Sequence, residues 1–177
     1  MSRPTSQLAS LGWDRHFQDK FMEIAPPGAA PARVIADYGA DYLLHDGDAV
    51  LRALARHVDP AVGDWVVLDG GDIRGIVERR TLFSRRAAGD LNRRQILATN
   101  VDVAFVVVAA TDVNVRRVER YLTIAWQSGA SPVVVVTKAD VFESVAAMRV
   151  ELESVAAGSP VIVTSSVTGE GVDAIEG

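Results

Sequence analysis

The chain has 177 residues, of which 49% are hydrophobic and 23% charged, which excludes wholesale disorder and suffices for one ordinary domain or two small ones. Its formal net charge of −5 excludes a protein that coats nucleic acid indiscriminately. It contains no cysteine, which excludes disulfides and thiolate metal sites and suits a reducing, cytoplasmic location, and its three histidines have no ligand spacing, so we expect no metal site in this chain.

Residues 1–30 are predicted to form a helical N-terminal extension. Apolar residues between Leu8 and Phe21 recur at the spacing of a short amphipathic helix, and the segment APPGAAPA at 25–32 ends it as a linker. The N-terminus is too polar for a signal peptide, and no apolar run approaches the roughly 20 residues that cross a bilayer. We therefore expect no membrane association.

Residues 31–95 alternate short apolar runs with turn residues. Asp46-Gly47, Gly63-Asp64 and Asp69-Gly70-Gly71 separate segments of strand length, as in compact antiparallel barrels and sandwiches. The segment is too short for a two-sheet sandwich, so a five-stranded oligonucleotide/oligosaccharide-binding (OB) barrel fits best. Asp64 and Trp65 are expected to turn and pack this barrel.

Residues 96–177 follow a different pattern, in which apolar runs of strand length alternate with helical periodicity. Such alternation predicts a parallel sheet with right-handed crossovers. The run at 101–110 is continuous, as in strands buried on both faces, and Trp126, like Trp13, is interpreted as a core or packing residue. The predicted order is strand 101–110, helix 115–129, strand 131–137, helix 142–158 and strand 159–166, and we expect the chain to stop inside a further element.

The segment TKAD at 137–140 ends one of these strands, and TSS at 164–166 ends the next. Ligands of open α/β sheets bind beyond the carboxyl ends of the strands. Asp140 there is able to accept the two adjacent donors of guanine, while the stem of Lys138 covers the base and backbone N–H groups at Ser165 and Ser166 meet its O6. A solvated rim with a helix-capping aspartate is the alternative interpretation.

The chain resembles the ribosome small-subunit-dependent GTPase A family in these motifs and in four further segments. The four are LGWDRHF at 11–17, GDWV at 63–66, RRQILATNVDVAFVV at 93–107 and the segment that leads from residue 116 into TKAD. The resemblance covers most of the chain. It implies an OB-fold domain, a circularly permuted P-loop GTPase domain whose guanine-recognition half comes first, and a C-terminal zinc-binding domain. The predicted fold class is therefore α/β plus all-β, with residues 31–95 as the OB barrel and residues 96–177 as the first part of the GTPase domain.

The resemblance implies that the full-length protein binds the small (30S) ribosomal subunit and hydrolyses GTP with Mg²⁺ late in subunit maturation, and that it holds a structural Zn²⁺. Carried over by position, the guanine-binding residues are Thr137, Lys138, Asp140, Ser165 and Ser166. Thr137 departs from the commoner asparagine. A phosphate loop of the form G-x-x-x-x-G-K-[ST] does not occur in these 177 residues, so we assign no catalytic residue and predict that this chain alone does not hydrolyse GTP.

The segment 74–94 holds seven arginines against two acidic residues, a local balance of +5 in an acidic chain. Arginine pairs near Phe83 suit phosphate contacts and base stacking, whereas a solvated arginine-rich linker is the alternative. With the resemblance, contact with 16S rRNA through Arg85, Arg86, Arg93 and Arg94 is favoured. A non-enzymatic OB-fold RNA-binding adaptor that uses no nucleotide is the alternative function.

Overall fold

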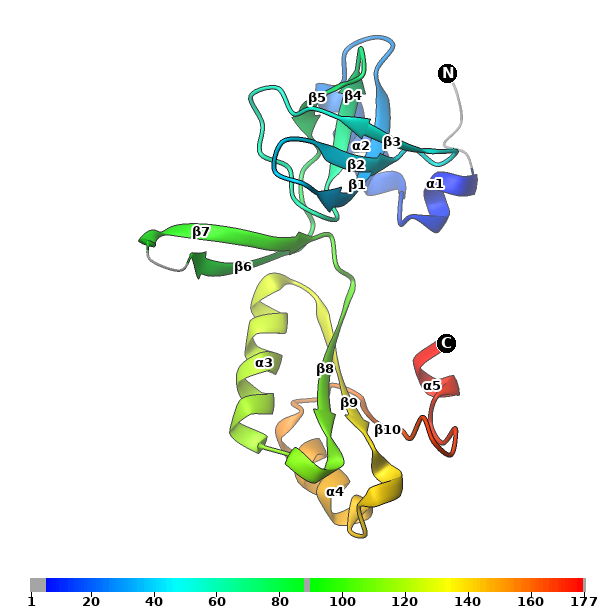
Figure 1. Cartoon of the computed structure of the whole chain (residues 1–177), viewed down its shortest axis with the longest axis vertical. Helices are drawn as coiled ribbons and strands as arrows, with labels where there is room; N and C mark the ends of the chain where they lie inside the picture. Colours follow the sequence, from blue (N-terminus) through cyan, green and yellow to red (C-terminus); the bar gives the residue numbers. More distant parts are fainter. Residues whose placement is uncertain (1–5, 88–89, 177) are drawn as a thin grey trace. The chain divides into compact units, whose positions relative to one another are not determined.

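Figure 1 shows the computed structural model of the chain, which describes residues 6–87 and 90–176, and their side chains apart from those of residues 6, 85–87, 90–94 and 176. The chain forms two compact units, Met1–Val101 and Asp102–Gly177. No helix within the described ranges is long and apolar enough to cross a membrane.

The N-terminal extension consists of two helices rather than the single one predicted, α1 (Ser6–Ser10) and α2 (Arg15–Ile24). The chain turns between them at Gly12, which has a φ of +89°, a value that favours glycine. Asp14 then caps α2 by accepting a hydrogen bond from the Phe17 backbone N–H at 3.2 Å. Trp13 and Phe17 are buried and pack against Trp65 of the following sheet, with the Trp13 and Trp65 ring centroids 4.6 Å apart.

The first unit is built on a five-stranded antiparallel sheet with the order β3-β2-β1-β4-β5. The segment that follows β3 meets β5 at one point: the Ile73 N–H donates to the Leu54 carbonyl at 2.8 Å, and the Ile73 carbonyl accepts from the Arg56 N–H at 2.9 Å. The turns fall at the predicted Asp and Gly positions. The strands are β1 (Ala30–Asp37), β2 (Tyr42–His45), β3 (Val50–Ala53), β4 (Trp65–Asp69) and β5 (Asp72–Ile76).

The arginine-rich segment forms most of a two-stranded antiparallel ribbon, β6 (Leu82–Ala87) and β7 (Asp90–Thr99), that pairs with no other strand in the described ranges. The ribbon projects from the five-stranded sheet (Figure 1). A solvated arginine-rich linker was the alternative interpretation of this segment, and most of the segment is paired as a β-ribbon in the first unit.

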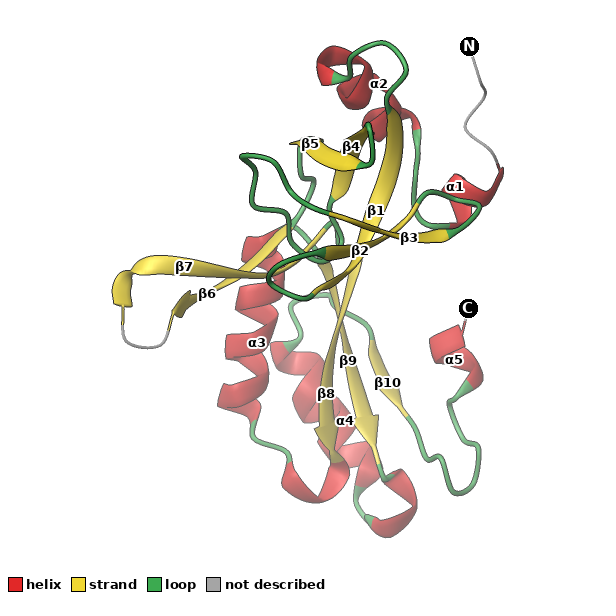
Figure 2. Ribbon diagram, turned by 45° about the horizontal axis from the view of Figure 1, so that its top comes forward, coloured by secondary structure: helices red, strands yellow, loops and turns green. Residues whose placement is uncertain are grey.

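The second unit has the predicted alternation of strands and helices around a parallel sheet of order β10-β9-β8. Helix α3 ends at the predicted glycine, Gly129, which adopts the left-handed conformation and donates its N–H to the carbonyls of Ala125 and Trp126. The elements are β8 (Val103–Ala109), η1 (Ala110–Asp112), α3 (Val115–Ser128), β9 (Ser131–Thr137), η2 (Ala139–Val141), α4 (Val145–Val155), β10 (Val161–Val163) and α5 (Asp173–Glu176); Figure 2 distinguishes helices from strands.

Helices α3 and α4 pack on one face of this sheet. Val106 and Val108 of β8 share a buried core with Val118 of α3 and Leu152 of α4. The prediction that residues 101–110 are buried on both faces is wrong, because Val107 on the opposite face is 59% exposed.

Of the two roles expected for Trp126, core or packing, the structure excludes the core. Its side chain is 50% exposed, whereas its neighbour in sequence Ala125 is buried, as are Val118 and Leu122 on the same face of α3. The periodicity of the helix identifies its buried face, and Trp126 lies at the margin of that face.

Candidate functional site

The candidate guanine site lies where β9 ends. Lys138 follows the strand in the left-handed conformation, with a φ of +60°, which is uncommon for a residue other than glycine, asparagine or aspartate. This turn directs the chain into η2, and both Lys138 and Asp140 are exposed. Asp140 does not precede a long helix, since Ser144 occupies the position before α4, so the helix-capping alternative does not describe it.

Asp140 is joined to the next strand end by a short hydrogen bond. The buried Ser165 hydroxyl donates to Asp140 Oδ1 at 2.6 Å and accepts the backbone N–H groups of Val167 and Thr168 at 3.2 Å each. One donor and two acceptor lone pairs are the full capacity of a hydroxyl. Ser165 therefore fixes both the carboxylate of Asp140 and the loop that faces it.

The loop after β10 is held by its own backbone. The Ser165 N–H donates to the Glu170 carbonyl, and its carbonyl accepts from the Gly169 N–H, both at 2.9 Å. At Gly171, with a φ of +68°, a side chain would collide with the Val163 carbonyl. The N–H of Ser165, one of the two predicted backbone donors for a guanine O6, is thus engaged within the loop, whereas Ser166 is exposed.

The parallel pairing brings the two strand ends together. Val136 of β9 is in register with Val163 of β10, and the Ala139 N–H donates to the Thr164 carbonyl at 3.2 Å. The Thr137 hydroxyl donates to the Val108 carbonyl of β8 at 3.3 Å, which commits it to the sheet. The structure thus joins Asp140 to Ser165, places Lys138 two residues before that carboxylate, and turns Thr137 toward the neighbouring strand.

The four predicted RNA-binding arginines belong to the ribbon. Arg85 and Arg86 lie in β6, Arg93 and Arg94 in β7, and the backbone register pairs Arg86 with Arg94. Their side chains lie outside the part of the chain that the structure describes. The backbone pairing of β6 with β7 therefore brings the two arginine pairs onto neighbouring strands.

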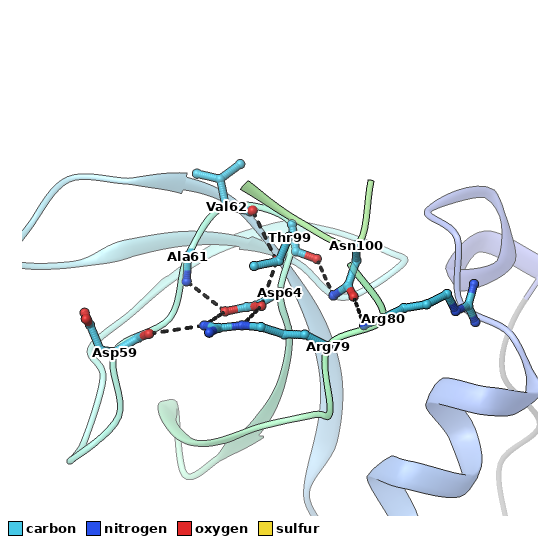
Figure 3. Close-up of polar contacts among 9 residues, drawn as sticks. Asp59, Ala61, Val62, Asp64, Arg79, Arg80, Thr99 and Asn100 are labelled. Atoms are coloured by element: carbon cyan, nitrogen blue, oxygen red, sulfur yellow. Dashed lines mark hydrogen bonds and ion pairs between the residues drawn. The ribbon is translucent and has the colours of Figure 1, made fainter. Parts of the chain in front are cut away.

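A buried carboxylate at the base of the ribbon is a feature that the sequence did not reveal (Figure 3). Asp64 is fully buried and accepts from Arg79 through Nε at 2.8 Å and Nη2 at 2.6 Å, from the Thr99 hydroxyl at 2.7 Å and from the Ala61 N–H at 2.8 Å. The hydrogen bonds from Asp64 raise the pKa of Arg79. Four donors occupy both carboxylate oxygens, so Asp64 is structural rather than a site for substrate.

Asn100 completes this cluster. Its side chain donates to the Gly63 carbonyl at 3.1 Å and accepts from the Arg80 N–H at 2.8 Å, which ties the end of the ribbon to the five-stranded sheet. In the described residues no group of three or more His, Asp or Glu side chains is arranged to hold a metal ion.

Comparison with known proteins places the chain in a family. The RsgA GTPase family matches residues 76–177. A small ribosomal subunit biogenesis GTPase RsgA of Syntrophotalea carbinolica is 39% identical over 94% of this chain and 52% of its own length, and one of Streptomyces coelicolor is 39% identical over 96% and 50%. The chain belongs to the RsgA GTPase family. The resemblance predicted from its motifs is confirmed.

Two solved structures share the fold of this RsgA-family chain. YjeQ from Thermotoga maritima matches 84% of the chain with a TM-score of 0.67 at 20% identity, and YloQ, described as a circularly permuted GTPase, matches 80% with a TM-score of 0.61 at 21% identity. The matches cover 56% and 53% of those two chains. The chain likewise spans about half the length of the curated relatives it matches.

Proposed function

We propose that this chain is the guanine-recognition half of a GTPase that binds the 30S ribosomal subunit late in its maturation. The hydrogen bond between Ser165 and the exposed Asp140 carries the proposal, because it fixes a carboxylate at the ligand edge of a parallel sheet. Names of the curated relatives support the ribosomal role.

A fixed carboxylate discriminates between purines. Guanine presents adjacent N1–H and N2–H donors, which the two oxygens of Asp140 accept together, whereas adenine presents no such pair. A base that lacks these donors leaves the carboxylate unpaired, and sites built on paired hydrogen bonds reject such analogues strongly. Lys138, which is exposed and lies two residues before Asp140 in the sequence, covers a face of the base with its aliphatic stem.

The sequence holds none of the groups that grip a triphosphate. Neither of its two lysines follows a glycine, whereas phosphate loops place a lysine after glycine-rich backbone that cradles the phosphates and before a Ser/Thr that meets Mg²⁺. We propose that GTP with Mg²⁺ binds only when the remaining half is present. The structural zinc site, which needs a Cys/His ligand set, belongs to that half, and this chain alone is inactive.

Base preference tests the proposal. We expect the full-length protein to bind GTP in preference to ATP, and Asp140→Asn to shift its preference toward xanthine nucleotides, because an amide donates where xanthine accepts. Isothermal titration with GTP, XTP and ATP measures this shift, and Asp173→Asn, in the short helix α5, is the matched control. An unchanged preference in Asp140→Asn would remove this carboxylate from the base site.

We further propose that the first unit is an OB barrel that contacts 16S rRNA. The contact between β5, at Ile73, and the segment that follows β3 supports a closing barrel. A hollow of about 280 Å³ lies beside β3 and the two turns that carry Asp41 and Gly71, which is the region that OB barrels use for oligonucleotides.

The same hollow favours the second candidate, a non-enzymatic RNA-binding adaptor. The two functions differ in their dependence on nucleotide. If the full-length protein bound 30S subunits equally with and without GTP and hydrolysed none, the adaptor would replace the GTPase.

A further inference from the structure

Helix α3 carries three arginines, and two of them have no acidic partner. Arg117 donates to the carboxylate of Asp112 at 3.0 Å and to its carbonyl at 2.7 Å. The side chains of Arg116 and Arg120 make no ion pair and no hydrogen bond within the described ranges. Every other arginine whose side chain the structure describes has a carboxylate or a carbonyl as its partner.

The two arginines share the face of α3 that points away from the sheet. Arg116 and Arg120 each come two residues before a buried core residue, Val118 and Leu122. Two residues are slightly more than half a turn of an α-helix, which puts both arginines opposite the buried face, and both are exposed. Residues four apart are neighbours on a helix surface, so the two guanidinium groups lie on one open face.

This arrangement costs the helix stability. Like charges four residues apart repel each other. Arg116 also lies in the first turn of α3, which contains no acidic residue and where the helix dipole disfavours a cation. Glu119, the only acidic residue of the helix, pairs with neither arginine in the part of the chain that the structure describes. Charges placed against local preference indicate a function, here the binding of an anion.

Arg120 is held ready for such an anion by the next residue. Its guanidinium lies over the ring of Tyr121, 5.3 Å from the ring centroid. Stacking fixes the plane of the guanidinium and leaves its N–H donors free, because those donors point outward in that plane. A guanidinium held by its face is suited to bind a phosphate with two parallel hydrogen bonds.

We propose that Arg116 and Arg120 contact the phosphate backbone of ribosomal RNA, in addition to the contact proposed for the ribbon. This inference rests on the proposed function, in which the full-length protein binds the 30S subunit. Residues 102–177 contain five lysines and arginines against ten acidic residues, and three of the five lie in α3. RNA is therefore repelled by most of the second unit and attracted to this helix, which favours one orientation.

An acidic protein segment is the other polyanion that the arginines suit. RNA is favoured because the outward face of α3 is polar along its length. Thr123 and Gln127 continue the face after the two arginines, and both are exposed. Protein interfaces have an apolar centre within a polar rim, and this face offers no such centre, whereas phosphate contacts need none.

Removing the two charges tests the proposal. We expect Arg116→Gln with Arg120→Gln in the full-length protein to lower the slope of log affinity for 30S subunits against log salt by about one to two, because each phosphate contact releases a condensed counterion. Glutamine preserves the helix, since its helix propensity is close to that of arginine. Arg15→Gln with Arg149→Gln removes the same charge from two arginines that already have acidic partners and is the matched control.

An unchanged slope in the α3 variant, or an equal change in the control, overturns the proposal. The result is separate from that of the proposed function. If the unaltered full-length protein does not bind 30S subunits, the proposed function fails and this inference fails with it. If the unaltered protein binds and the α3 variant keeps its slope, this inference alone fails.

Photo-crosslinking identifies the partner directly. The photoreactive residue p-benzoylphenylalanine replaces Thr123, which lies on the same face of α3, and in the control it replaces Val150 of α4, which is 67% exposed. After irradiation of the full-length protein bound to 30S subunits, we expect position 123 to crosslink to 16S rRNA and position 150 not to. A crosslink from position 123 to a ribosomal protein or within the polypeptide overturns the proposal, as does an rRNA yield no higher than that at position 150.

Discussion

At the scale of single residues, the candidate site depends on one hydroxyl that acts in two directions. Ser165 donates to Asp140 and accepts from the loop at Val167 and Thr168. Removing it frees the carboxylate to rotate and loosens the loop that faces it. A hydrogen bond to a charged group contributes about 1.5–3 kcal/mol, so Ser165 has a large share in positioning Asp140.

We predict that Ser165→Ala in the full-length protein lowers the affinity for GTP and GDP alike by about tenfold, the equivalent of about 1.4 kcal/mol, since the loss concerns the base and not the γ-phosphate. Ser165→Thr, which keeps the hydroxyl, should restore most of the affinity. Ser154→Ala is the control, because its hydroxyl donates only to the Glu151 carbonyl within α4. Titration calorimetry measures all three; a full-affinity Ser165→Ala would show that Asp140 is positioned by other means.

Two glycines of the same loop form a matched pair. Gly169 and Gly171 both have positive φ, but only at Gly171 would a side chain collide with backbone, the Val163 carbonyl, while at Gly169 the space is open. We predict that Gly169→Ala destabilises the protein by about 1 kcal/mol from conformation alone, and that Gly171→Ala costs clearly more. Urea unfolding followed by far-ultraviolet circular dichroism compares the two. Equal losses would mean that the loop shifts to admit the methyl group.

At the scale of elements, the ribbon is attached to the sheet through a buried ion pair. Asp64 is 0% exposed and Arg79 is 23% exposed at the side chain. We predict that Arg79→Met destabilises the first unit by about 3 kcal/mol, because it leaves a buried carboxylate without its cation. Arg15→Met is the control, since its ion pair with Asp19 is 94% and 65% exposed and such pairs contribute less than about 1 kcal/mol.

Tryptophan fluorescence follows this unfolding, because Trp13 and Trp65 both lie in the first unit and are buried. A loss in Arg79→Met no greater than that in Arg15→Met would contradict a structural role for the pair. Thr99→Val removes the hydroxyl that donates to the same carboxylate, and its loss of stability should fall between the losses in Arg79→Met and Arg15→Met.

The elements of the second unit were predicted from the sequence where the signal was local. The period of α3, its terminal Gly129 and the β-branched run of β9 each specify their own structure. The exposure of β8 was not predicted, because an apolar run indicates that a strand is suited to burial but does not indicate which elements cover its two faces. The Asp64–Arg79–Thr99 cluster was missed because its members are 15 and 35 residues apart and meet only through the folded sheet.

At the scale of the whole molecule, the sequence separates charge between segments. The chain carries a net charge of −5, yet residues 74–94 hold seven arginines against two acidic residues, and most of this segment forms the ribbon. A polyanion therefore meets attraction at the ribbon and repulsion from most of the rest of the chain. Such a distribution favours one orientation on RNA over indiscriminate coating.

We predict that binding of the full-length protein to 30S subunits weakens steeply with salt, and that replacing Arg85 and Arg86 by alanine lowers the slope of log affinity against log salt by about one to two, because each phosphate contact releases a condensed counterion. Replacing Arg15 and Arg149 by alanine removes the same charge from α2 and α4 and is the control. Filter binding between about 50 and 200 mM salt covers the range in which such contacts change affinity most. An unchanged slope in the ribbon variant, or an equal change in the control, would mean that the ribbon is solvated and that other groups hold the RNA.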